Sequence, residues 1–163
     1  MKKKVLIDIS VRHVHLTREN VDILFGDGYE LVPRKILGQG YGGFAADERV
    51  TLVGPKGTIH KVAILGPYRP TQIEIALTDA RTLGIQPPIR LSGDTAGSSP
   101  IRIVGPKGEI YLEEGAIIAK RHMHITKAVA DKWGISNDSL VSVQIEIPDR
   151  TVVYKDIPCR ITL

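Results

Sequence analysis

Residues 49–65 read Arg49-Val50-Thr51-Leu52-Val53-Gly54-Pro55-Lys56-Gly57-Thr58-Ile59-His60-Lys61-Val62-Ala63-Ile64-Leu65. Aliphatic and β-branched residues fill both arms of this segment, which predicts two β-strands. The Gly-Pro-Lys-Gly between them is typical of a tight turn, because proline fixes one φ angle and glycine tolerates positive φ. Its spacing and flanking structure differ from those of a phosphate-binding P-loop. The segment therefore predicts a β-hairpin whose turn has a structural role.

Most of the chain continues this pattern of short β-rich runs bounded by Gly, Pro, Asn or Asp. The predicted strands are Lys4–Ile9, Arg49–Val53, Thr58–Leu65, Thr71–Leu77, Ile101–Val104, Glu109–Leu112, Ala116–Lys120, Leu140–Ile147 and Thr151–Tyr154. Many short strands at turn-rich spacing favour small β-barrels. The expected fold class is therefore mainly β with short α-helices, built as two interlocked small β-barrels capped by the helices.

Three short helices are predicted, over residues 17–25, 78–83 and 126–133. A threonine stands at the start of the first and the last, where its hydroxyl is a good N-cap. A glycine follows all three, as is common where a helix ends.

Two motifs occur twice in the chain. The turn segment Leu52–Gly57 recurs as Ile103–Gly108, and the hexapeptide Arg12–Thr17 recurs as Arg121–Thr126. The hexapeptide precedes the turn in the first copy and follows it in the second. Two barrels that exchange terminal strands would account for this order.

The duplication predicts two barrel domains. The first is expected over residues 1–60 and is completed by a C-terminal strand over 157–163. The second is expected over residues 61–156.

Composition limits the classes of function. The chain of 163 residues is 42% hydrophobic and 25% charged, which is typical of a globular protein. No apolar run approaches the ~20 residues needed to cross a bilayer, so no membrane association is expected. The net charge of +4 is spread along the chain and aromatic residues are few, which disfavours nucleic acid as a partner.

Cys159 is the only cysteine, which excludes an intrachain disulfide and is compatible with a reducing compartment. Its apolar surroundings favour a buried structural cysteine over a nucleophile. The N-terminus lacks the pattern of a signal peptide. A cytoplasmic location is therefore expected.

Four of the five histidines lie in the two hexapeptides, as His13, His15, His122 and His124. Alternate side chains of a strand share a face, so each pair projects together. Neutral imidazole is a common metal ligand, and the two pairs predict the halves of a metal centre, with zinc favoured. Glu74 lies on the polar face of a predicted strand and is a candidate carboxylate ligand. The competing interpretation is a duplicated strand–helix junction whose histidines only form hydrogen bonds.

Two further segments carry candidate groups. Arg69 lies in a rigid turn, Gly66–Pro70, just before the strand of Glu74, and a guanidinium there could clamp an oxyanion bidentately. Residues 92–99, beginning with Ser92, are rich in hydroxyls and exposed amides, as in loops that cradle phosphate. Most such loops only connect two elements of secondary structure. This loop therefore supports a phosphate site only in combination with the other candidate residues.

Taken together, these segments resemble the PduL-type phosphate acyltransferases, the phosphate propanoyltransferase family. The resemblance covers the chain from about Ser10 to Arg160. Its markers are Ser10–Leu16, Phe44–Ala46, Val50–Gly57, Leu65–Arg69, Thr71–Glu74, Thr78–Arg81, Leu83–Ile85, Ser92–Asp94, Gly97–Ser98 and Arg121–His124.

The resemblance implies a dinuclear zinc site, with two ions per chain, at the junction of the barrels. Its ligands by position would be His13, His15, Glu74, His122 and His124. It also implies that Arg69 binds phosphate and stabilises the transition state, with Ser92 assisting. Ser10, Lys35 and Leu65 would lie near the path of coenzyme A. A homodimer is expected.

The implied activity is reversible transfer of a short acyl group between coenzyme A and inorganic phosphate, which gives an acyl phosphate. Two alternatives remain open at this stage. One is a zinc hydrolase that uses metal-bound hydroxide on an ester or phosphoester. The other is a non-catalytic module that binds coenzyme A or zinc, because the family pattern continues past the last strand of this chain.

Overall fold

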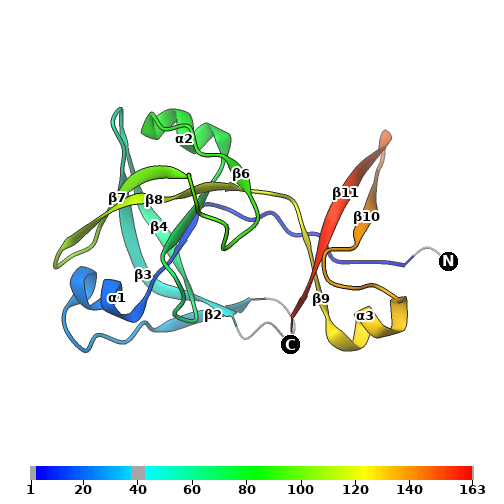
Figure 1. Cartoon of the computed structure of the whole chain (residues 1–163), viewed down its shortest axis with the longest axis horizontal. Helices are drawn as coiled ribbons and strands as arrows, with labels where there is room; N and C mark the ends of the chain where they lie inside the picture. Colours follow the sequence, from blue (N-terminus) through cyan, green and yellow to red (C-terminus); the bar gives the residue numbers. More distant parts are fainter. Residues whose placement is uncertain (1–2, 38–42, 163) are drawn as a thin grey trace.

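The computed structural model describes residues 3–37 and 43–162, which form a mainly β structure with three short helices (Figure 1). The first part of the chain contains β1 (His13–His15), α1 (Arg18–Phe25), β2 (Pro33–Leu37), β3 (Gly43–Val53), β4 (Thr58–Gly66), β5 (Gln72–Ile75), α2 (Leu77–Leu83), β6 (Ile89–Arg90), β7 (Ser99–Val104) and β8 (Glu109–Ala119). The second part contains β9 (Met123–Thr126), α3 (Lys127–Trp133), β10 (Leu140–Ile147) and β11 (Arg150–Thr162).

Six strands of the first part close into a barrel. Pairing runs from β3 through β4, β1, β5, β8 and β7 and returns to β3. Strands β2 and β6 extend the sheet beside β3 and β8. Aliphatic side chains that face inward fill the barrel, among them Val14, Leu52, Ile64, Ile73, Ile103 and Ile117. The predicted mainly β class with a closed barrel is confirmed.

The second part is a three-stranded sheet in the order β10-β11-β9, with α3 beside it (Figure 1). Its small core contains Ile125, Ala130 and Cys159. Cys159 is fully buried, as predicted, and burial raises the pKa of its thiol. The predicted domain limits, 1–60 with 157–163 and 61–156, stay a prediction, and Leu163 lies outside the described residues.

The three predicted helices are confirmed to within one or two residues at each end. Thr17 accepts a hydrogen bond from the Asn20 amide as the N-cap of α1, and Gly26 ends that helix. The predicted strand Lys4–Ile9 is wrong, because the segment has no strand assignment and Leu6 is 97% exposed. A run of β-favouring residues alone does not make a strand, since the backbone also needs a neighbouring strand with which to form hydrogen bonds.

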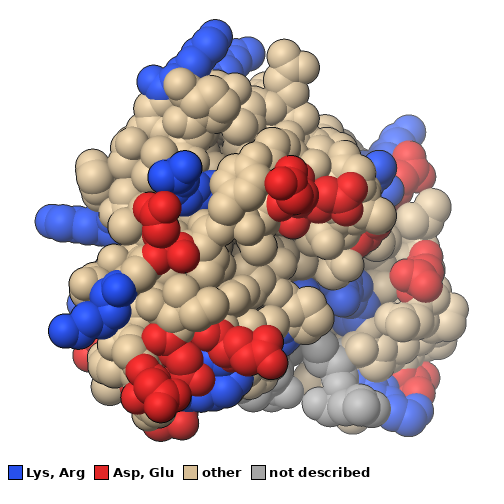
Figure 2. Space-filling view, turned by 60° about the vertical axis from the view of Figure 1, so that its left-hand side comes forward, with Lys and Arg blue, Asp and Glu red and all other residues tan. Residues whose placement is uncertain are grey.

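Charged side chains of both signs are interspersed over the face shown in Figure 2. Within the described residues, no helix is long and apolar enough to cross a membrane.

Each repeated Gly-Pro-Lys-Gly turn packs on the end of a helix distant in sequence. The Lys56 amide donates to the Leu83 carbonyl of α2 at 3.0 Å, and the Lys107 amide donates to the Leu24 carbonyl of α1 at the same distance. Both carbonyls belong to last turns, whose acceptors have no partner inside the helix. The structural role predicted for the motif is confirmed, and both copies make the same contact with the end of a helix.

Gly105→Ala is expected to destabilise the protein by about 1–3 kcal/mol, because overpacking a tight contact forces the backbone to shift. A Cβ at Gly105 would lie 2.5 Å from the Leu24 carbonyl oxygen and 2.8 Å from its Cβ. Gly43→Ala is the matched control, since its Cβ would meet its nearest neighbour at 3.4 Å. Urea denaturation of both variants measures the difference, and equal midpoints would contradict the packing argument.

Candidate metal centre

Antiparallel pairing of β1 with β5 brings two histidines to one carboxylate. The register places His13 opposite Glu74 and His15 opposite Gln72. Val14, between the histidines, points into the barrel core and is fully buried. The histidines therefore share the opposite face of β1, as strand alternation predicts. His13, His15 and Glu74 are nevertheless all buried, at 6–8% exposure.

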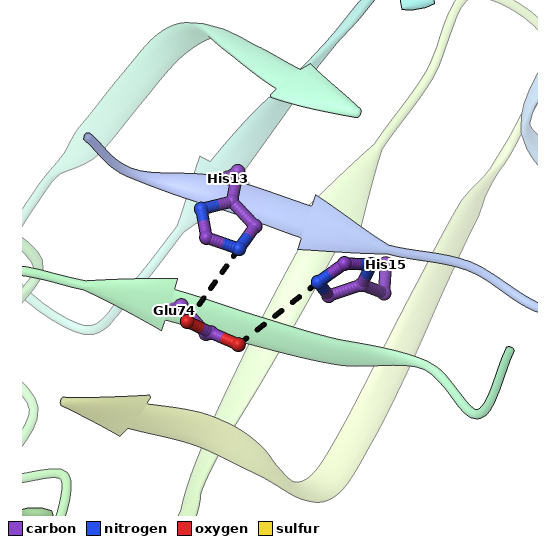
Figure 3. Close-up of side chains that lie close together, drawn as sticks. All are labelled: His13, His15 and Glu74. Carbon is purple, nitrogen blue, oxygen red and sulfur yellow. Dashed lines mark ion pairs between the residues drawn. The ribbon is translucent and has the colours of Figure 1, made fainter. Parts of the chain in front are cut away.

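The three side chains converge on one point (Figure 3). His13 Nε2 lies 3.5 Å from Glu74 Oε2, and His15 Nε2 lies 3.9 Å from Glu74 Oε1. One ligand atom from each residue falls within 4.8 Å of the other two. A cation between these atoms would have three protein ligands, as catalytic zinc sites commonly have.

Backbone carbonyls fix which imidazole nitrogen faces the carboxylate. His13 Nδ1 lies 2.9 Å from the Val11 oxygen, and His15 Nδ1 lies 3.0 Å from the Leu65 oxygen. A carbonyl only accepts, so each Nδ1 carries the proton and donates. Both Nε2 lone pairs then face Glu74, and acceptors that face one another need a cation between them. The residues present therefore fit a zinc ion, with carbonyls that orient the ligands.

The electrostatics keep His15 and Glu74 in the form that binds metal. Burial, together with the charges of Arg69 and His13, lowers the pKa of His15 to about 4, although Glu74 opposes this. Burial by itself would raise the pKa of Glu74, but the hydrogen bond and charge of His13 in its protonated form, and a hydrogen bond from Ser92, lower it to about 2. At neutral pH the imidazole of His15 is therefore neutral and Glu74 is ionised.

A hydrogen-bonded network joins Glu74 to Arg69 and Ser92. Arg69 Nη2 donates to Ser92 Oγ at 3.0 Å. Gln72 Nε2 donates to both Ser92 Oγ and Glu74 Oε1 at 2.7 Å. The Gly93 amide donates to Gln72 Oε1 at 2.7 Å. The predicted anion clamp, Arg69 with Ser92, thus lies beside the predicted metal ligands.

The second histidine pair lies at the start of β9. His122 Nε2 is 3.0 Å from His124 Nε2, and His122 Nδ1 is 2.7 Å from the Lys120 oxygen. Burial, His122 and Arg160 lower the pKa of His124 to about 4, and the charge of Glu74 acts against them. Glu74 therefore interacts electrostatically with the second pair. Among the residues that the structure describes, the group whose ligand atoms lie close enough together to hold one metal ion is His13, His15 and Glu74.

Residues 6–163 match the family model described as phosphate propanoyltransferase. The chain belongs to this family. A phosphate propanoyltransferase of Thermotoga maritima is 48% identical over 158 residues, which are 96% of this chain and 75% of the relative. Those of Listeria monocytogenes and Clostridioides difficile are 47% and 44% identical, and the matches cover 74% and 78% of their lengths and 97% and 99% of this chain. The family resemblance seen in the sequence is confirmed, and the protein is an acyltransferase enzyme.

Three residues of this phosphate propanoyltransferase family member were predicted to lie near coenzyme A. Lys35 on β2 and Leu65 on β4 both pair with Ala45 of β3, so they lie on either side of it. Leu65 also supplies the carbonyl that orients His15. Ser10 lies in the exposed segment before β1. The structure thus links Leu65 to the metal centre and places Lys35 two strands away from Leu65, on the far side of β3.

Sequence reasoning missed two residues of the network. Gln72 is fully buried and connects Glu74, Ser92 and Gly93. Its signal was present, because it shares the polar face of β5 with Glu74. Arg160 on β11 donates to the Ser92 carbonyl at 3.0 Å. It reaches this point because β11 pairs with β9 in a register that sets Arg160 beside His124, and the sequence holds no local signal of that pairing.

Proposed function

We propose that this protein transfers a short acyl group reversibly between coenzyme A and inorganic phosphate, which gives an acyl phosphate. The observation that carries the proposal is the contact of Arg69 with Ser92 within the network that holds Glu74. The anion clamp and the candidate metal centre are therefore close enough to contact the same bound substrate. The named activity of the relatives agrees with this chemistry.

Inorganic phosphate is a poor nucleophile that carries about two negative charges at neutral pH. Arg69 would bind two of its oxygens bidentately, with Ser92 assisting because its Oγ holds the guanidinium in place. Arg160, anchored on the Ser92 carbonyl, adds positive charge to the same loop. Held in line with the thioester carbonyl, phosphate attacks from a bound geometry, which removes much of the entropic barrier.

His13, His15 and Glu74 would hold one zinc ion, and His122 with His124 would contribute to a second. Bound zinc supplies Lewis acidity that polarises a carbonyl or phosphate oxygen. Arg69 would stabilise the negative charge that develops on the carbonyl oxygen. A thiolate is a good leaving group, so no strong general acid is required.

The proposed chemistry needs no side-chain nucleophile. Cys159 is buried in the core of the second sheet and its pKa is raised, so it is neither accessible nor ionised at neutral pH. Phosphate itself attacks the acyl carbon, the C–S bond breaks, and coenzyme A leaves as the thiolate, which then takes a proton from solvent.

Release of free thiol from acetyl-CoA or propanoyl-CoA is expected to depend on added phosphate. In reverse, loss of acetyl phosphate is expected to require coenzyme A. Both dependences follow from direct transfer, and a thiol reagent together with an acyl phosphate assay measures them. Thiol release without phosphate would identify a hydrolase, and binding of coenzyme A without turnover would identify a binding module.

Further parts of the proposal rest on the family resemblance. We propose two zinc ions per chain, a path for coenzyme A past Ser10, Lys35 and Leu65, a homodimer, and a cytoplasmic location. Metal analysis of the purified protein and its mass in solution test the first and third of these.

A further inference from the structure

Arg69 lies in the loop between β4 and β5, and its neighbour Tyr68 ties that loop to α1 and to the segment before β2. Arginine has a long side chain with many rotamers, so a clamp at a fixed place needs a fixed backbone. Contacts of residues 66–71 supply this fixed backbone.

The Tyr68 hydroxyl is fully used. It donates to Glu30 Oε2 at 2.8 Å and accepts from Arg18 Nη1 at 2.9 Å and from the Leu31 amide at 3.4 Å. A phenol has one donor and two acceptor positions, so no hydrogen-bonding capacity is left over. The Arg18 guanidinium carbon also lies 5.3 Å from the centre of the Tyr68 ring.

Hydrogen bonds of the residues that follow Tyr68 also reach the start of α1 and the residue before it. The Arg69 amide donates to the Leu16 carbonyl at 3.0 Å, one residue after His15. Thr71 Oγ1 accepts from the Thr17 amide at 3.0 Å and from Asn20 Nδ2 at 2.7 Å. The loop is therefore anchored after Tyr68 as well: the Arg69 amide binds the residue that follows β1, and Thr71 binds the start of α1.

We infer that Tyr68 is a positioning residue for phosphate: its hydroxyl holds the loop against α1 and the segment before β2, so that the Arg69 guanidinium stays at Ser92. This inference rests on the proposed function, since it assigns phosphate to Arg69. A preformed clamp loses less side-chain freedom when the anion binds, and this favours binding. Loss of the Tyr68 hydroxyl is therefore expected to weaken the binding of phosphate and to leave the binding of acyl-CoA unchanged.

Tyr68→Phe tests the inference, because it removes one oxygen and keeps the ring beside Arg18. Tyr29→Phe is the matched control, since Tyr29 is equally exposed at 37% and also donates to a glutamate, Glu48, at 2.7 Å. Hydrogen bonds to charged groups support an expected rise in KM for phosphate of about tenfold in Tyr68→Phe. The KM for acyl-CoA should change by less than about twofold in both variants. An equal KM for phosphate in the two variants, or parallel changes for both substrates, would overturn the inference.

Amide hydrogen exchange separates this inference from the proposed function, because it needs no activity. The Arg69 amide is expected to exchange about tenfold faster in Tyr68→Phe than in the unaltered protein, and unchanged in Tyr29→Phe. The same exchange rate in all three proteins would refute the anchoring by Tyr68. Absence of phosphate-dependent turnover in the unaltered protein would instead refute the proposed function.

Discussion

Glu74→Gln is expected to abolish zinc binding by the first histidine pair and to lower kcat/KM for phosphate-dependent thiol release by about 10³-fold or more. The substitution keeps the shape of the side chain and removes the negative charge toward which both Nε2 atoms point. An amide also presents an NH₂ group, which cannot bind a cation. Loss of a Lewis acid removes several kcal/mol of stabilisation, and each 1.36 kcal/mol is tenfold in rate.

Metal content and rate must fall together for this explanation to hold. Zinc is measured in the purified proteins by elemental analysis, and thiol release is measured with and without added zinc. Glu109→Gln is the control, because this glutamate lies at the exposed start of β8 and pairs with Arg102. A Glu74→Gln protein that retains its zinc and its rate would remove Glu74 from the metal centre.

Local patterns were sufficient to predict the parts of this site that lie on one strand. The His-x-His spacing put His13 and His15 on one face, and the alternation around Glu74 put its carboxylate on the polar face of β5. The hairpin of β3 and β4 followed in the same way from residues 49–65, because its strands are joined by a short turn. In each case the structure is determined by interactions between residues that lie close together in the sequence.

Pairings between distant segments were beyond this reasoning. That His13 faces Glu74 depends on the register of β1 with β5, and that Arg160 reaches Ser92 depends on a contact across 68 residues. The tail segment Lys4–Ile9 shows the reverse case, where a strand-like pattern finds no neighbouring strand. Register is set by packing of the whole barrel, which no single window of sequence encodes.

Arg69→Gln is expected to lower kcat/KM for phosphate by about 10²–10³-fold, the cost typical of removing one preorganised donor from a developing oxyanion. The guanidinium donates to Ser92 Oγ and is half-buried, so its remaining N–H groups act where water screens them poorly. Arg69→Lys should recover only part of the rate, because an ammonium cannot bind two phosphate oxygens in the fixed geometry of a guanidinium.

Zinc content distinguishes this effect from loss of the metal centre. The hydrogen bonds from Arg69 toward Glu74 run through Ser92 and Gln72, so the ligand atoms keep their places in Arg69→Gln, which should keep its zinc while losing its rate. Arg102→Gln is the control for loss of a positive charge, since Arg102 is exposed on β7 and pairs with Glu109. If Arg69→Gln lost zinc as completely as Glu74→Gln, the arginine would serve to hold the metal ligands in place. A rate that falls at constant zinc would place it on the phosphate, where the attack on the acyl carbon is made.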